Sequence, residues 1–185
     1  MRATAVVFLA GATMAVSACS ANESKDADHK ASATPSAVQS SKPADPAETA
    51  KKEAIGTYEK YWQEMERLYA DSKGKSSDLA QYAASAALSN AEADAKQMHG
   101  KGLIVSGEVT VGRPTVTNAD LNRMVPNVTL SSCLDVSRWR VLDQDTKKPA
   151  ALPSTRLTKY VITSTIERWP QGWRVIRDEP QAKAC

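Results

Sequence analysis

Three cysteines carry the most reactive side chains of this 185-residue chain, at positions 19, 133 and 185. A cysteine can act as a nucleophile, a metal ligand, half of a disulfide or an attachment point for lipid. Neither Cys133 nor Cys185 has an activating partner beside it in the sequence, and together with the distant His99 they lack the spacing of a metal site. We therefore expect no cysteine nucleophile and no metal.

Three carboxylates, Glu108, Asp120 and Asp135, are the candidates for acid–base chemistry. Glu108 is out of phase with the apolar residues around it, Asp120 lies in a turn-like stretch, and Asp135 follows Cys133 by two residues on the same expected strand face. Each position favours a structural role. The sequence also lacks a G-x-S-x-G elbow and a phosphate-binding loop, so we assign no catalytic residue and expect no cofactor.

Residues 1–18 have the pattern of a secretory signal. Met1-Arg2 is positively charged, and residues 3–15 are apolar or small but too few to remain as a spanning helix. The segment ends in Val16-Ser17-Ala18-Cys19, which resembles a bacterial lipobox. The resemblance implies cleavage before Cys19, a diacylglycerol thioether on its sulfur and a further acyl chain such as palmitate. Two or more chains anchor a protein stably to a bilayer. The alternative is an ordinary secretion signal with an accidental cysteine.

If Cys19 carries lipid, Cys133 and Cys185 remain as an even pair in a compartment that permits disulfides. A bridge between them is the favoured interpretation, and two unpaired, buried thiols are the alternative. Residues 19–47 then form a disordered tether, because from Ser20 to Ala47 the chain has one large aliphatic residue, Val38, and three prolines. The folded domain is expected over residues 48–185.

The domain is predicted to begin with helices and to continue with strands. Apolar residues recur at three- and four-residue steps from Ile55 to Tyr69, with Glu53, Glu64 and Glu66 on the opposite, polar side. Ser76, Ser77 and Asp78 offer a predicted N-cap for an alanine-rich helix that ends at His99-Gly100.

Beyond Gly100 the apolar period changes to two, which predicts strands. The first is expected to be a long bent strand over residues 103–116, with breaks at its glycines and proline. Further strands are predicted over 124–135, 139–141, 157–169 and 173–177. The fold class is therefore α+β, with N-terminal helices on a curved antiparallel sheet of about four strands.

Four aromatic residues of the helices, Tyr58, Tyr61, Trp62 and Tyr82, have two interpretations. They can line a ligand pocket with amphipathic walls. They can equally fill the core, because the only phenylalanine lies at position 8. The core interpretation is favoured.

The charge is uneven. Residues 48–100 carry 7 basic and 9 acidic side chains, whereas residues 101–185 carry 13 and 8. The basic excess suits a solvated outer sheet face, or contact with anionic lipid or an anionic cell-wall polymer. A nucleic-acid partner is not expected of a domain held outside the membrane.

The order of these elements resembles that of NTF2-like (cystatin-like cone) domains, and in particular those of small actinobacterial lipoproteins. The resemblance is carried by five short features: Tyr58-x-x-Tyr61-Trp62, Tyr82-Ala83, Cys133-Leu134-Asp135-x-Ser137-x-Trp139, Gly172-Trp173-Arg174-Val175 and the terminal Cys185. It implies a sheet that curves around the first helix, a cavity at the open end of the cone and a Cys133–Cys185 bridge.

The resulting expectation is a lipid-anchored, extracytoplasmic binding or protein-interaction module. Its partners would be the membrane, an envelope protein or wall polymer, or a small molecule. The alternative is a small cavity enzyme of the isomerase, dehydratase or hydrolase type. A carboxylate buried beside Tyr58 or Tyr61 with a strongly raised pKa would favour the enzyme, and a cavity filled by side chains would exclude both the enzyme and the small-molecule binder.

Overall fold

The structure is a computed structural model that describes residues 45–73 and 75–185. The expected signal, the lipid site at Cys19 and nearly all of the tether lie outside the described residues. Within the described ranges, no helix has the length and apolar character needed to cross a bilayer.

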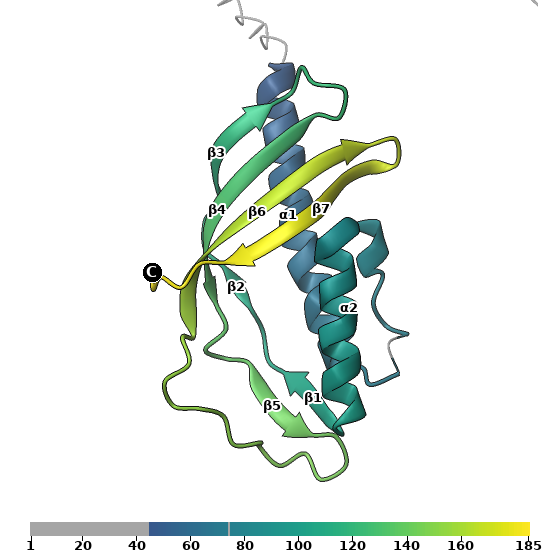
Figure 1. The fold of residues 1–185 in the computed structure, drawn as a ribbon, viewed down its shortest axis with the longest axis vertical. Helices are drawn as coiled ribbons and strands as arrows, with labels where there is room; N and C mark the ends of the chain where they lie inside the picture. Colours follow the sequence, from purple (N-terminus) through teal and green to yellow (C-terminus); the bar gives the residue numbers. More distant parts are fainter. Residues whose placement is uncertain (1–44, 74) are drawn as a thin grey trace, which may run out of the picture. The chain divides into compact units, whose positions relative to one another are not determined.

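Helix α1 (Pro46–Ala70) is the central element of the domain (Figure 1). It begins two residues before the boundary expected at 48, because Asp45 caps it by accepting a 2.9 Å hydrogen bond from the Ala47 N–H and because proline suits the first helical position. Its buried face includes Ala54, which has no exposed surface.

The polar side of α1 is not fully solvated as the sequence suggests. Glu64 is buried, with only 5% of its surface exposed, and accepts a 2.8 Å hydrogen bond from the Asp78 N–H while pairing with Arg67. Glu53 accepts from the Trp173 indole at 3.1 Å. The helical period marks these residues as polar, but a carboxylate can face inward where backbone or indole N–H donors meet it. These glutamates connect α1 to the elements around it.

The alanine-rich helix begins later than predicted. A short 3-10 turn, η1 (Leu79–Gln81), is followed by Ala83, which forms a parallel bridge with Val175, and only then by α2 (Ser85–Gly100). Asp78 makes no side-chain cap, whereas Ser77 Oγ accepts from the Leu79 N–H at 3.2 Å at the start of η1. The extended backbone at Ala83 pairs with the sheet, which delays the start of α2. The predicted end at His99-Gly100 is confirmed, and His99 Nε2 lies 3.2 Å from the Tyr69 carbonyl.

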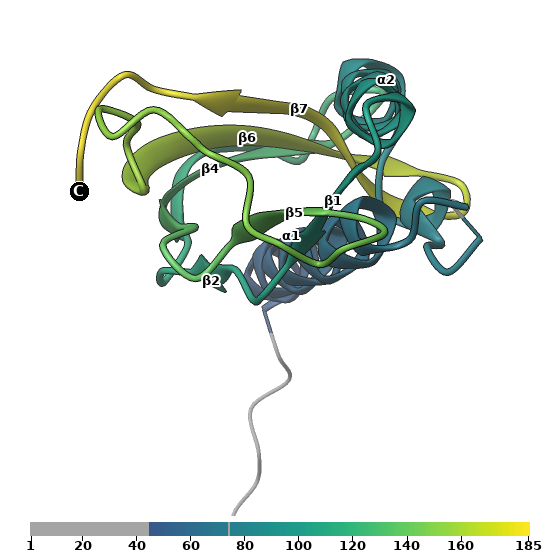
Figure 2. The ribbon, with the colours of Figure 1, turned by 90° about the horizontal axis from the view of Figure 1, so that it is seen from below.

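The strands form a strongly curled antiparallel sheet. Its path is β2 (Thr110–Val111), β4 (Asn127–Asp135), β6 (Lys159–Trp169) and β7 (Gly172–Pro180), and β3 (Thr115–Asp120) also pairs with β4. The strands arch over α1, and α2 lies at one side (Figure 2). The expected α+β architecture of helices on a curved antiparallel sheet is confirmed.

The long bent strand predicted over 103–116 is divided into separate pieces. β1 (Leu103–Ser106) leaves the main sheet and pairs with β5 (Arg140–Asp143), while β2 and β3 pair with β4. At the break, the backbone of Gly112 approaches that of Cys133 closely, since a Cβ at Gly112 would lie 2.8 Å from the Cys133 carbonyl oxygen. The next strand begins at Asn127, not at Met124, whose side chain is 99% exposed.

A β-bulge interrupts the pairing of β6 with β7. Thr165 pairs with Arg177 and Ile166 with Val175, which leaves Ile176 without a partner. Val175 lies on the buried face, and beyond the bulge Asp178 pairs with the buried Ser164. Partners directly opposite one another share a sheet face. The bulge therefore moves Asp178 to the inner face, a place that strict alternation would have given to Arg177.

A disulfide joins Cys133 on β4 to Cys185, with the two Cα atoms 5.9 Å apart. The bridge expected between these cysteines is confirmed. It fixes the segment after β7 to the middle strand of the sheet.

Candidate functional site

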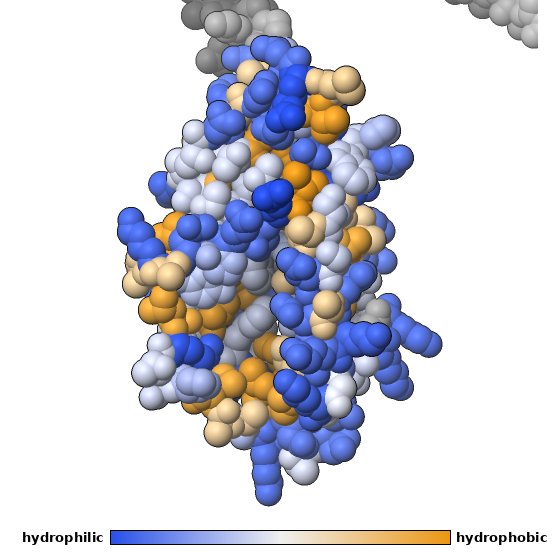
Figure 3. All heavy atoms as spheres, in the orientation of Figure 1, coloured by the Kyte–Doolittle hydropathy of each residue, from blue (hydrophilic) through white to orange (hydrophobic). Residues whose placement is uncertain are grey.

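A cavity of about 600 Å³ opens beside α2, under the C-terminal end of β7. Figure 3 shows this face of the domain hollowed beside α2. α1 supplies Tyr61 and Trp62, β6 supplies Tyr160, and β7 supplies Asp178. On the α2 side the lining includes Ala87 and Ala91, whose small side chains leave room for the cavity. The remaining lining residues are Met65, Tyr69, Ala86, Asn90, Asp94, Trp139, Ile162, Arg177, Glu179 and Pro180.

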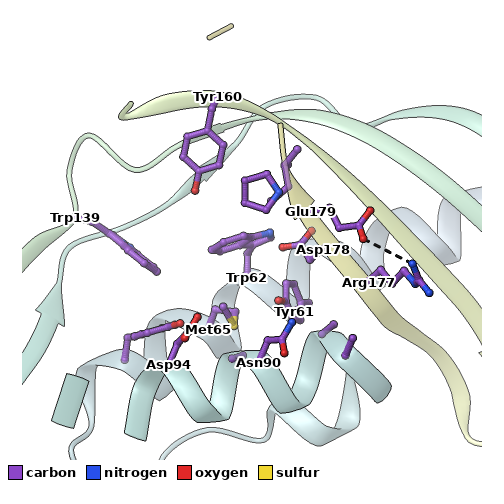
Figure 4. Close-up of a pocket in the computed structure, with 16 residues that line it drawn as sticks. Tyr61, Trp62, Met65, Asn90, Asp94, Trp139, Tyr160, Arg177, Asp178 and Glu179 are labelled. Atoms are coloured by element: carbon purple, nitrogen blue, oxygen red, sulfur yellow. Dashed lines mark ion pairs between the residues drawn. The ribbon is translucent and has the colours of Figure 1, made fainter. Parts of the chain in front are cut away.

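Aromatic rings form a continuous series along one wall. Trp62 contacts Tyr61 with ring centres 5.6 Å apart and Trp139 with ring centres 6.1 Å apart, and Trp139 in turn lies 5.5 Å from Tyr69. The Tyr160 ring points into the same space from the sheet (Figure 4). Such walls offer a ligand flat, rigid apolar contact with polar edges.

Asp178 is the carboxyl group of the cavity whose pKa is clearly shifted by burial. Burial raises its pKa to about 7, and hydrogen bonding by Ser164, Tyr58 and Tyr61 opposes that rise only in part. The Ser164 hydroxyl donates to Asp178 Oδ1 at 2.5 Å. Burial also raises the pKa values of Tyr58 and Tyr61, so both phenols stay protonated as donors. The site thus holds a carboxyl group that titrates near neutral pH among hydroxyl donors.

Two indole N–H groups lie buried behind the wall, and neither makes a well-aligned hydrogen bond among the described residues. The Nε1 atoms of Trp62 and Trp139 are both buried and lack a hydrogen-bond partner. A buried N–H without an acceptor costs about 1–3 kcal/mol. Neither Nε1 atom has accessible surface in the cavity, and the Trp62 side chain lies near the Tyr58 hydroxyl instead.

The four aromatic candidates from the sequence have different positions. Tyr61 and Trp62 line the cavity. Tyr58 is fully buried beneath it, with its hydroxyl 3.5 Å from Ser132 Oγ. Tyr82 is partly buried and packs on the core outside the lining, and its carbonyl accepts from the Val175 N–H. The helical aromatics thus serve both as core and as cavity wall.

None of the three carboxylates weighed from the sequence lines the cavity. Glu108 is exposed and lies 3.4 Å from Arg138. Asp120 is exposed at the end of β3. Asp135 pairs with Lys159 at 2.8 Å and accepts from the Ser137 N–H, and these contacts lower its pKa.

Sequence reasoning missed Asp178 because it ended the last strand at Arg177 and could not place the bulge at Ile176. The signal that could have identified Asp178 was the presence of a carboxylate directly after a segment in which apolar and polar residues mostly alternate. Its position meets the condition stated above for the enzyme, a buried carboxylate beside Tyr58 and Tyr61 with a raised pKa. In residues 45–73 and 75–185 no group of His, Cys, Asp and Glu side chains is arranged to hold a metal ion.

Comparison with known proteins assigns no family. No family model matches the chain, and no curated protein matches it. A solved structure that it resembles is the intermembrane space region of the chloroplast protein ARC6, with 12% identity and a TM-score of 0.43. The match covers 77% of this chain and 100% of that one.

Proposed function

We propose that this chain is a lipid-anchored extracytoplasmic protein whose cavity domain binds a small, uncharged molecule that carries acceptor oxygens. The observation that carries the proposal is the cavity of about 600 Å³, whose wall is a series of aromatic rings including Tyr61, Trp62 and Trp139. The cavity is not filled by side chains, the outcome that would have excluded a small-molecule binder.

The chemistry of the lining defines the ligand class. Aromatic walls favour a ring or another flat apolar face. The Tyr160 hydroxyl and the protonated form of Asp178 offer hydrogen-bond donors to oxygen atoms. Even with Asp178 protonated, the acids Asp94 and Glu179 outnumber Arg177 at the cavity, which disfavours an anion.

A cavity-filling pair of variants tests the proposal. Ala91→Leu places extra methyl groups at the lining, and Ala93→Leu places the same groups on the exposed side of α2. A library of small neutral oxygen-bearing molecules is screened for compounds that raise the melting temperature of the native protein. We expect these compounds to lose that effect with Ala91→Leu and to keep it with Ala93→Leu. Equal responses of the two variants would contradict binding in this cavity.

A second candidate function, acid–base catalysis in the same cavity, is favoured by Asp178. A carboxyl group with a pKa of about 7 can take up and release protons near neutral pH. Binding without turnover remains the first proposal, because Ser164, Tyr58 and Tyr61 already engage this carboxyl group. Incubation of each binding compound with the native protein, followed by NMR, separates the two: a product that is lost with Asp178→Asn would establish the enzyme.

The anchored, extracytoplasmic location is supported by the lipobox at Val16–Cys19 and by the bridge between Cys133 and Cys185, which needs an oxidising compartment. We also propose that the domain is of the NTF2-like kind found in actinobacterial lipoproteins, on its order of helices and curled sheet. Exposed basic residues, including Arg138, Arg140 and Lys147, leave a wall polymer or envelope protein as a further partner.

A further inference from the structure

Two turns at one end of the domain form an apolar tip. It consists of Met124, Val125 and Pro126 from the β3–β4 turn, Trp169 at the end of β6 and Pro170 from the β6–β7 turn, which together line a shallow depression. The Arg168 N–H donates to the Pro126 carbonyl at 2.8 Å and holds the turns together. Figure 3 shows apolar atoms among hydrophilic ones at this end of the domain.

The exposure of the apolar tip has no explanation within the fold. Met124 is 99% exposed and Trp169 is 37% exposed. Single exposed apolar residues are ordinary, but a contiguous group contributed by two turns marks an interaction surface. Arg123 and Arg168 are exposed beside it. Exposed methionine and tryptophan flanked by arginine suit a surface with an apolar interior and anionic groups at its outer boundary.

The attachment of the chain indicates which surface the tip meets. The described domain begins at Asp45, and Figure 1 places the start of α1 at the same end as the β3–β4 turn. Only 25 residues separate Cys19 from Asp45, so a fully extended chain spans about 90 Å at most. An anchor at Cys19 would therefore hold the domain within that distance of the bilayer and attach it at the end that carries the apolar tip.

We infer that the apolar tip inserts into the interfacial region of an anionic lipid bilayer, with Met124 and Trp169 among the headgroups and Arg123 and Arg168 at the phosphates. The inference rests on the proposed lipid anchor, which brings the domain to the membrane. Tryptophan prefers the membrane interface, and an arginine near an anionic surface is attracted to it. The apolar tip and the lipid at Cys19 would together fix the orientation of the domain relative to the bilayer. The lipid alone would leave the domain free to reorient.

Hydrogen exchange on artificially tethered protein tests the tip independently of Cys19. Residues 20–185, which retain every described residue of the domain, are attached through an N-terminal histidine tag to vesicles of phosphatidylcholine, phosphatidylglycerol and a nickel-chelating lipid. We expect amide exchange in segments 121–127 and 168–173 to slow at least threefold on the vesicles relative to the same protein in solution. Unchanged exchange in both segments would overturn the inference.

Matched variants separate insertion from other contacts. Met124→Glu combined with Trp169→Glu should abolish the protection. Leu152→Glu combined with Leu157→Glu should preserve it, because those side chains are 41% and 47% exposed in the loop at the opposite end of the domain. Protection of the same segments in concentrated solution without lipid would instead establish a contact between two copies. The anchor itself is tested separately, by fractionation of a Cys19→Ser variant in cells.

Discussion

Replacement of Asp178 by asparagine should change how the stability of the domain depends on pH. The pKa of Asp178 is raised from 3.8 to about 7, chiefly because its carboxyl group is buried. The folded state therefore binds a proton that the unfolded state releases near pH 4. This contribution to stability is complete below pH 4 and is lost as the pH rises through 7.

The magnitude follows from the difference between the two pKa values. About three pKa units correspond to about 4 kcal/mol once the group is ionised in both states. Residue 178 retains partial exposure, so we expect a smaller loss of about 2–4 kcal/mol between pH 4 and pH 8. Asp178→Asn keeps the size of the side chain and has no proton to lose. The variant should therefore be the more stable protein at pH 8. Its free energy of unfolding should lack the fall between pH 4 and pH 8 that Asp178 causes in the native protein.

Urea unfolding of the native protein and of Asp178→Asn at one-unit pH steps from 4 to 8 measures the effect. The lowered pKa values of Asp71 and Asp135 affect stability only at lower pH, and both proteins share them. Parallel curves for the two proteins would refute the assignment of a raised pKa to Asp178, and with it the cavity carboxyl on which the second candidate function depends.

Three further changes have expected outcomes. Cys19→Ser should move the protein from the membrane to the soluble fraction in cell fractionation, and an unchanged membrane fraction would contradict the lipid anchor. Replacement of Cys133 and Cys185 by serine should lower the free energy of unfolding by about 2–5 kcal/mol, measured by urea denaturation without reductant; equal midpoints would show that the bridge contributes little. Glu64→Gln should cost about 1–3 kcal/mol in the same assay, because the buried carboxylate accepts a backbone N–H and pairs with Arg67, whereas the exposed Glu59→Gln should be neutral.

The sequence predicted the architecture well because apolar periodicity reports burial directly. Alternation around Ile162 and Ile166 placed β6 correctly, and the aromatic face of α1 lies in the core. The parity of the cysteines predicted the bridge that joins Cys133 to Cys185. These features depend on residue type and local spacing, which one sequence contains.

Only part of the candidate site could be predicted from the sequence. Tyr61 and Trp62 were identified because aromatic residues on a helix face are conspicuous. The inward position of Asp178 depends on the β-bulge at Ile176, and the place of that bulge is set by the pairing of β6 with β7. A bulge is a property of two strands together, so no local period in either one predicts it. Glu64 was misplaced for a related reason, since its partner is a backbone N–H from a distant turn.

The length of α1 has a consequence for how a ligand would arrive. The helix begins at the end of the domain that carries the apolar tip, and Tyr61 and Tyr69 lie 15 and 23 residues beyond Pro46. At 1.5 Å per residue, the helix carries them about 20–35 Å along its axis. On a domain docked by its tip, the cavity would stand above the headgroups by a distance comparable with the thickness of the hydrocarbon core. α1 would then act as a fixed spacer, and the ligand would arrive from the aqueous side rather than from within the lipid.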